Sequence, residues 1–128
     1  MKYIRFFEEL GLSDVAMVGG KNASLGEMYC QLTEKGILIP NGFATTADAY
    51  WHYIEYNNLT DEMISTLDGL DTGDMKKLAA CGQQLRSMIA HATMPDDLES
   101  EIIEAYIRLA KQYDEQTLAV SVRSSATA

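Results

Sequence analysis

Residues 19–28 read Gly19-Gly20-Lys21-Asn22-Ala23-Ser24-Leu25-Gly26-Glu27-Met28 and place a lysine between a glycine pair and a helical pattern. Glycine adopts backbone angles that other residues avoid, so the chain can turn sharply at the pair and pass close to a ligand. Apolar residues then recur at helical spacing, at Leu25, Met28, Tyr29 and Leu32. The stretch therefore predicts a helix that begins within a residue or two of Lys21.

The start of such a helix suits an anion. Its first N–H groups have no partner inside the helix, and the helix dipole is positive at this end. A lysine ammonium beside these groups adds a charge that matches a phosphate oxygen. Short glycine motifs are common, however, and taken alone the stretch favours the plainer interpretation, a loop followed by a solvated Lys21.

Composition and charge exclude several classes of protein. The chain has 128 residues, of which 47% are hydrophobic, enough to fill the core of one small domain. The net charge of −9 argues against a nucleic-acid surface, which needs clustered Lys and Arg. Residues 1–7 have no signal-peptide pattern and no apolar run is long enough to span a membrane. We therefore expect a cytoplasmic protein with neither nucleic acid nor membrane as partner.

The apolar pattern predicts an α+β chain that is rich in helix and has a few short strands. Strands are expected at Tyr3–Phe7, between Gly42 and Thr46, and at Leu118–Val122, with a loop at Gly11–Gly20. Helices are expected at about residues 20–35, 47–57, 60–67, 74–92 and 96–113. Their ends are marked by Gly36, Thr46, Thr60, Asp68-Gly69 and Pro95. Cys30 and Cys81 fall in helices without metal-type spacing, so we expect reduced core thiols.

Arg123 is the second basic residue in a special place. It follows the strand predicted at Leu118–Val122 and precedes Ser124 and Ser125. A guanidinium there can bind a phosphate through two parallel hydrogen bonds, with the two hydroxyl groups as further donors. Taken alone, an arginine paired with a surface carboxylate is the simpler interpretation. Together, Lys21 and Arg123 are the two kinds of cation that a polyphosphate needs.

Three strings resemble a known family in matching order along the chain. They are VGGKNASLGEM at residues 18–28, IPNGFATTADAY at residues 39–50 and VRSSATA at residues 122–128. They resemble the N-terminal nucleotide-binding region of the phosphoenolpyruvate synthases, and pyruvate phosphate dikinases and rifampicin phosphotransferases have looser versions. Three ordered matches are far more specific than one glycine motif. A strand that runs directly into VRSSATA is also an unusual C-terminus, so we expect the chain to be part of a longer polypeptide.

The resemblance implies a fold and a site. Residues 1–128 would form a single partial domain, the first subdomain of an ATP-grasp fold in which two α+β subdomains hold ATP between them. The ATP phosphates would contact Lys21 and Arg123, with weaker contributions from Gly19, Gly20 and Ser124. The resemblance also implies Mg²⁺, with its ligands beyond residue 128. No catalytic or metal-binding residue is expected in the chain itself.

For the whole enzyme, the resemblance implies transfer of phosphate from ATP to a histidine and then to pyruvate, which gives phosphoenolpyruvate, AMP and phosphate. Its implied partners are ATP, pyruvate bound by other domains, and the remaining domains of the same polypeptide. His52 and His91 lie in helical patterns that lack a phosphohistidine motif, and the chain alone is expected to be inactive.

Two alternatives remain open. The first is the N-terminal region of a pyruvate phosphate dikinase or a rifampicin phosphotransferase. The second is a non-catalytic helical interaction module, which predicts that Lys21 and Arg123 lie far apart on opposite faces.

Overall fold

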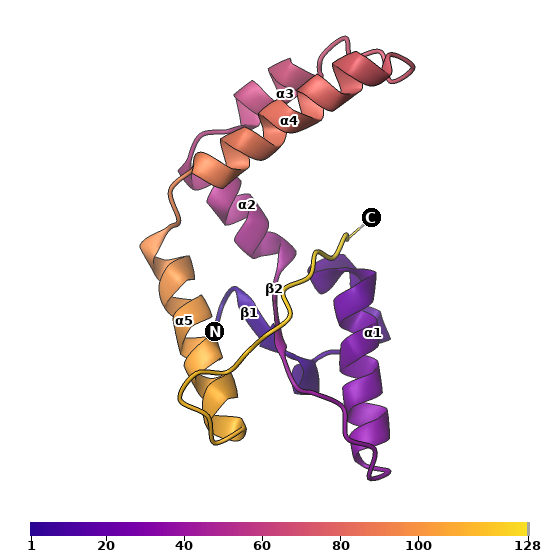
Figure 1. Cartoon of the computed structure of the whole chain (residues 1–128), viewed down its shortest axis with the longest axis vertical. Coiled ribbons are helices and arrows are strands. Elements are labelled where there is room, and N and C mark those ends of the chain that lie inside the picture. Colours follow the sequence, from indigo (N-terminus) through magenta and orange to yellow (C-terminus); the bar gives the residue numbers. More distant parts are fainter. Residues whose placement is uncertain (128) are drawn as a thin grey trace. The chain divides into compact units, whose positions relative to one another are not determined.

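A computed structural model describes residues 1–127 of the chain, which form two compact units (Figure 1). The first unit comprises residues 1–50 and the residues from 96 onward, and the second comprises residues 51–95. The first contains β1 (Ile4–Phe6), η1 (Phe7–Glu9), η2 (Leu12–Asp14), α1 (Val15–Thr33), β2 (Phe43–Thr45) and α5 (Asp96–Gln112). Helix α2 (Ala47–Tyr56) leads from the first unit into the second, which also contains α3 (Thr60–Leu67) and α4 (Met75–His91). The described residues are thus α+β and rich in helix, as the sequence predicts.

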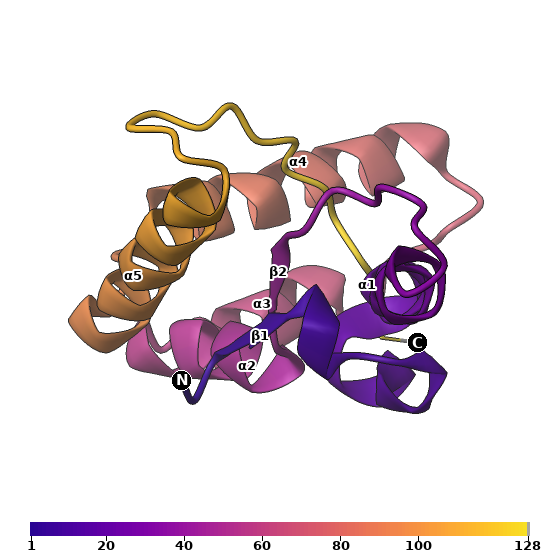
Figure 2. The ribbon, with the colours of Figure 1, turned by 90° about the horizontal axis from the view of Figure 1, so that it is seen from below.

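A two-stranded antiparallel ribbon forms the centre of the first unit (Figure 2). Strand β1 pairs with β2 so that Ile4 lies opposite Thr45 and Phe6 lies opposite Phe43. Because side chains alternate along a strand, Ile4 and Phe6 point to the same face, where they are buried against Ala105 and Leu109 of α5. The ribbon is therefore held by α5, and the strand predicted near residues 3–7 is confirmed.

Helix α1 packs through small residues against Leu10 and against Ala44 of β2. Ala23 is fully buried in a cluster with Val18, Leu10 and Ala44. A Cβ atom at Gly26 would lie 2.7 Å from the Leu10 carbonyl oxygen, so the absence of a side chain there lets the two segments touch. Of the larger apolar residues that reveal the helix in the sequence, Leu25, Tyr29 and Leu32 are half-buried and Met28 is exposed. The close approach of α1 thus depends on its small residues.

The helix ends follow the sequence closely. Gly36 has φ +79°, and the N–H groups of Gly36 and Ile37 donate to the carbonyls of Thr33 and Leu32, an arrangement that closes the last turn of α1. The Thr46 hydroxyl accepts from the N–H of Ala49 at 3.3 Å and caps α2. Asp74 caps α4 by accepting from the N–H groups of Lys76 and Lys77.

The second unit is built on the pair α3 and α4. Cys81 is buried between them, and its thiol lies 3.4 Å from the Thr66 carbonyl oxygen. The side-chain amide of Asn57 exchanges two hydrogen bonds with the backbone of Thr93, at 2.8 and 2.9 Å, and so ties the end of α2 to the segment after α4. Cys30 is half-buried and, like Cys81, is a free thiol, as predicted. No helix among residues 1–127 is long and apolar enough to cross a membrane.

Two predicted elements are wrong. Residues 118–122 do not form a strand, because a strand needs a neighbour to pair with its backbone. The backbone N–H and C=O of Leu118 instead bond the Tyr106 hydroxyl at 2.9 Å, and the segment continues to α1 in extended form. The loop predicted at Gly11–Gly20 is also too long, since helix α1 already begins at Val15.

Glu101 of α5 ties the start of the chain to this helix. Its two carboxylate oxygens accept the backbone N–H groups of Lys2 and Tyr3, each at 2.8 Å. Partial burial opposes ionisation of Glu101, but these N–H groups and the positive chain terminus outweigh it and hold its pKa below the ordinary value. The ionised carboxylate therefore stabilises the folded state.

We expect Glu101→Gln to lower the free energy of unfolding by about 1–3 kcal/mol at neutral pH, because a neutral amide accepts these hydrogen bonds less strongly. Since the folded pKa is lowered, the contribution is complete above the unfolded pKa of about 4.3 and is lost as the pH falls through the folded value. Urea denaturation at several pH values measures this difference. Glu104→Gln, an exposed change on the same helix, is the control; equal losses in both variants at pH 7 would contradict the role of Glu101.

Candidate functional site

Helix α1 is sharply kinked at Gly19, where φ is +81° and ψ is 160°. The helix resumes directly after this residue, so Gly20 and Lys21 lie in the first turn of its long second part. Across the kink, the side-chain amide of Asn22 donates to the Val18 carbonyl at 2.9 Å. The glycine turn and the helix start next to Lys21 are thus present, as the sequence predicts.

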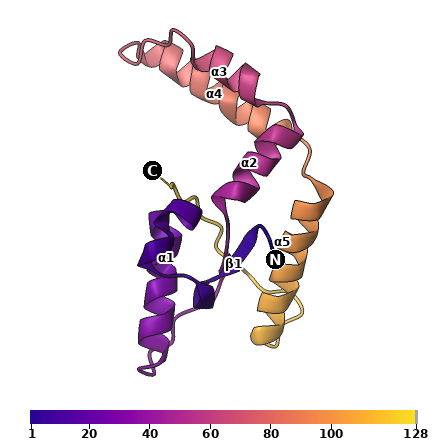
Figure 3. The same ribbon diagram turned by 180° about the vertical axis from the view of Figure 1, so that it is seen from behind.

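The segment after α5 runs back across the first unit and meets α1 at this kink (Figure 3). The N–H of Gly20 donates to the Ala126 carbonyl at 3.2 Å, and the Lys21 ammonium donates to the Ser124 carbonyl at 3.4 Å. Between them, the Ser125 hydroxyl is buried next to Gly19 and has no hydrogen-bond partner among the described residues. Two segments about a hundred residues apart in the sequence therefore form one contact. We call residues 19–21 and 124–126 together the Gly19 joint.

Arg123 stands beside this joint. It is bonded to Ser124, so its Cα atom lies within about 10 Å of the Lys21 ammonium. Its side chain is exposed and donates from Nε to the Ser121 hydroxyl at 3.3 Å. The structure thus brings Lys21, Gly19, Gly20 and Ser124 together and places Arg123 next to them, although Arg123 follows an extended segment rather than the predicted strand. The backbone of Arg123 thus lies near Lys21, where an interaction module predicts the two residues far apart.

The acceptors that the two cations contact here are weak. The bonds of Lys21 to Ser124 and of Arg123 to Ser121 are long, exposed and made to neutral oxygens. A phosphate oxygen is a stronger acceptor because it is charged, and an arginine fork can bind two of its oxygens at once. Both side chains could therefore exchange these contacts for a polyphosphate without breaking a buried interaction.

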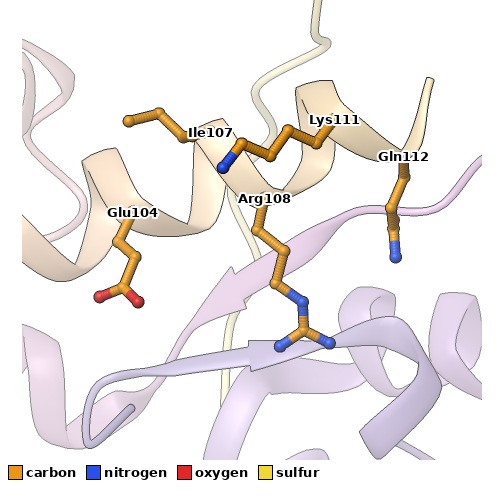
Figure 4. A pocket seen from close by; sticks show the side chains of 5 residues that line it. All are labelled: Glu104, Ile107, Arg108, Lys111 and Gln112. Atoms are coloured by element: carbon orange, nitrogen blue, oxygen red, sulfur yellow. The ribbon is translucent and has the colours of Figure 1, made fainter. Parts of the chain in front are cut away.

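Two other cations lie together on α5, where Arg108 and Lys111 line a hollow with Glu104, Ile107 and Gln112 (Figure 4). The Arg108 guanidinium bonds Glu8 at 2.6 Å and stacks over the Phe6 ring at 4.1 Å. Arg108 is thus engaged in joining α5 to the start of the chain. The sequence pattern did not reveal the ion pair of Arg108 with Glu8, because the two residues are a hundred positions apart.

Both histidines belong to the second unit and make contacts within it. His91 Nδ1 is 2.8 Å from the Ser87 carbonyl oxygen of its own helix, and the His52 ring lies beside that of Tyr56. Among residues 1–127, no three His, Cys, Asp or Glu side chains are grouped so that they could hold a metal ion.

The family model of the pyruvate phosphate dikinase AMP/ATP-binding domain matches residues 15–128, which include every residue of the Gly19 joint and Arg123. The chain belongs to this AMP/ATP-binding domain family. The kinked helix α1 and the segment that carries Arg123 are therefore parts of an AMP/ATP-binding domain of the pyruvate phosphate dikinase type.

Curated relatives of this AMP/ATP-binding domain are phosphoenolpyruvate synthases. The chain is 47% identical over its whole length to phosphoenolpyruvate synthase of Pseudomonas aeruginosa, and 44% identical over 98% of its length to that of Neisseria meningitidis; it covers 16% of each of these proteins. It is also 44% identical over its whole length to a probable phosphoenolpyruvate synthase of Methanocaldococcus jannaschii, of which it covers 10%. The chain spans about a tenth to a fifth of the length of the curated relatives it matches.

Proposed function

We propose that the chain is the N-terminal ATP-binding part of a phosphoenolpyruvate synthase, and that Lys21 and Arg123 bind the phosphates of ATP. The contact of Lys21 with Ser124, the residue next to Arg123, is the observation that carries this proposal. Membership of an AMP/ATP-binding family indicates the ligand, and the exposed side chains of the two cations have the charge that matches its phosphates. Such a pair can stabilise the charge that shifts between phosphate oxygens during transfer.

The proposal gives the two cations different tasks. The guanidinium of Arg123 is planar and can hold two oxygens of one phosphate in a fixed orientation. The Lys21 ammonium is a point charge on a flexible stem, so it can follow a phosphate group as charge develops on it. Gly20 and Ser124 contribute less, because the Gly20 N–H already donates to Ala126 and Ser124 meets Lys21 through its backbone carbonyl.

We propose that Mg²⁺ is bound by residues outside this chain. The Gly19 joint offers a lysine ammonium and backbone groups, which are not the carboxylate ligands that Mg²⁺ prefers. A bound Mg²⁺ would neutralise phosphate oxygens during transfer. We therefore assign phosphate binding to Lys21 and Arg123, and metal binding to further parts of the polypeptide.

The remainder of the proposed reaction also needs further domains. In a longer cytoplasmic polypeptide, these residues would be the first subdomain of an ATP-grasp fold, and a second subdomain would close over ATP. Phosphate would pass from ATP to a histidine and then to pyruvate, which with water gives phosphoenolpyruvate, AMP and phosphate. Downstream domains would supply both the histidine and the pyruvate site.

We expect Lys21→Ala and Arg123→Ala each to slow phosphorylation of the catalytic histidine by ATP about 100-fold or more in the longer polypeptide, because each removes charge that stabilises the transferring phosphate. Rapid-quench labelling with γ- and β-³²P-ATP measures the step. Lys35→Ala, just after the C-terminal end of α1, and Arg86→Ala, on α4 of the second unit, remove exposed cations that are not part of the joint and serve as controls. Wild-type labelling in Lys21→Ala and Arg123→Ala would overturn the assignment.

The 128-residue chain alone should bind ATP weakly at best and consume none in the presence of pyruvate, because only one side of the nucleotide would be held. Isothermal titration calorimetry with ATP and Mg²⁺ tests this expectation. A micromolar dissociation constant for the chain alone would show that the site needs no second subdomain.

A further inference from the structure

Gly19 has a backbone conformation that almost excludes other residues. Its φ of +81° and ψ of 160° lie in a region that only glycine enters readily, because a Cβ atom there collides with the neighbouring backbone. The residue is also buried, whereas a residue at such a turn is ordinarily exposed to solvent. The conformation therefore serves a contact with another part of the chain.

That contact is with Ser125 and Ala126. A Cβ atom built on Gly19 would lie 2.6 Å from the Ala126 carbonyl oxygen and would overlap the Ser125 hydroxyl. The Ala126 carbonyl carbon would lie 2.9 Å away, so two of the three nearest atoms belong to backbone, which cannot swing aside as a long side chain can. The missing side chain of Gly19 is thus the space into which the segment after α5 fits.

Gly19 differs from the other glycines of the chain in combining these two features. Gly36 and Gly69 also have positive φ, but a Cβ atom at either would meet open space. Gly26 is closely approached by Leu10 but has no positive φ. Among the nine glycines, only Gly19 has both a positive φ and a backbone contact that a Cβ atom would break.

We infer that Gly19 is a positioning residue of the phosphate site, whose lack of a side chain lets residues 124–126 dock on α1 and so sets Arg123 beside Lys21. This inference rests on the proposed function of Lys21 and Arg123. It gives Gly19 a role that differs from ligand binding, since its contacts are with Ser125 and Ala126. Docking also brings the Ala126 carbonyl to the Gly20 N–H and the Ser124 carbonyl to Lys21.

The docking can be tested in the 128-residue chain without any nucleotide, by residue-resolved hydrogen exchange. The amide of Gly20 reports on the joint, because it donates to Ala126. We expect Gly19→Ala to reduce protection of the Gly20 amide at least tenfold, while the amides of the buried residues Ala23 and Gly26 keep theirs and show that the fold is intact. Gly36→Ala imposes the same positive φ on an alanine in open space and should leave the Gly20 amide protected.

A second variant approaches the joint from the other side and imposes no strain on α1. Ser125→Leu places a larger side chain against Gly19, where no space is left, and should also expose the Gly20 amide. Thr127→Leu, at an exposed residue just outside the joint, is its control. Wild-type protection of the Gly20 amide in both Gly19→Ala and Ser125→Leu would overturn the inferred docking role.

The consequence for the nucleotide is measured in the longer polypeptide, by ATP-dependent phosphorylation of its histidine at varied ATP. Gly19→Ala should raise the KM for ATP at least tenfold, in the same direction as Lys21→Ala, and Gly36→Ala should match the wild type. If Lys21→Ala is impaired while Gly19→Ala keeps a normal KM, the positioning role is wrong and the proposed function stands. If Lys21→Ala and Arg123→Ala both behave as wild type, the proposed function fails, and with it the positioning role, even where hydrogen exchange shows the joint.

Discussion

The contact between the bare backbone of Gly19 and the segment Ser125–Ala126 is the constraint on which the candidate site depends. Without it, Lys21 would lie on a helix and Arg123 on a separate extended segment, and no contact would hold the two residues near each other. Two hydrogen bonds, from Gly20 and Lys21 to the carbonyls of Ala126 and Ser124, follow from the same approach. Both are exposed or partly exposed, so close packing at Gly19 gives the joint its precision.

Other contacts in the first unit direct the segment after α5 toward this joint. Helix α5 is fixed by the buried pair Ile4 and Phe6 and by the carboxylate of Glu101, which holds the start of the chain. The Tyr106 hydroxyl then bonds both backbone groups of Leu118 and directs the chain away from α5. The position of Arg123 is thus set at two points, near α5 by Tyr106 and at α1 by Gly19.

Local patterns predicted most of the fold because its helix ends are determined locally. Gly36, Thr46 and Asp74 each act within one turn of their own helix, so the sequence alone locates those boundaries. The strand predicted at Leu118–Val122 failed because strand formation depends on a partner that local alternation does not reveal. The candidate site was predictable as a pair of cations, but the contact between Gly19 and Ser125 was not, because it joins segments about a hundred residues apart.

If Lys21 and Arg123 hold one polyphosphate between them, as we propose, their contributions to ATP affinity are coupled, and a double-mutant cycle measures that coupling. Dissociation constants for ATP with Mg²⁺ would be measured in the longer polypeptide for the wild type, Lys21→Ala, Arg123→Ala and the double variant. Two groups that grip one ligand should show a coupling free energy of at least about 0.5 kcal/mol. Losses that simply add, or single variants with wild-type affinity, would show that the two cations do not hold one ligand between them.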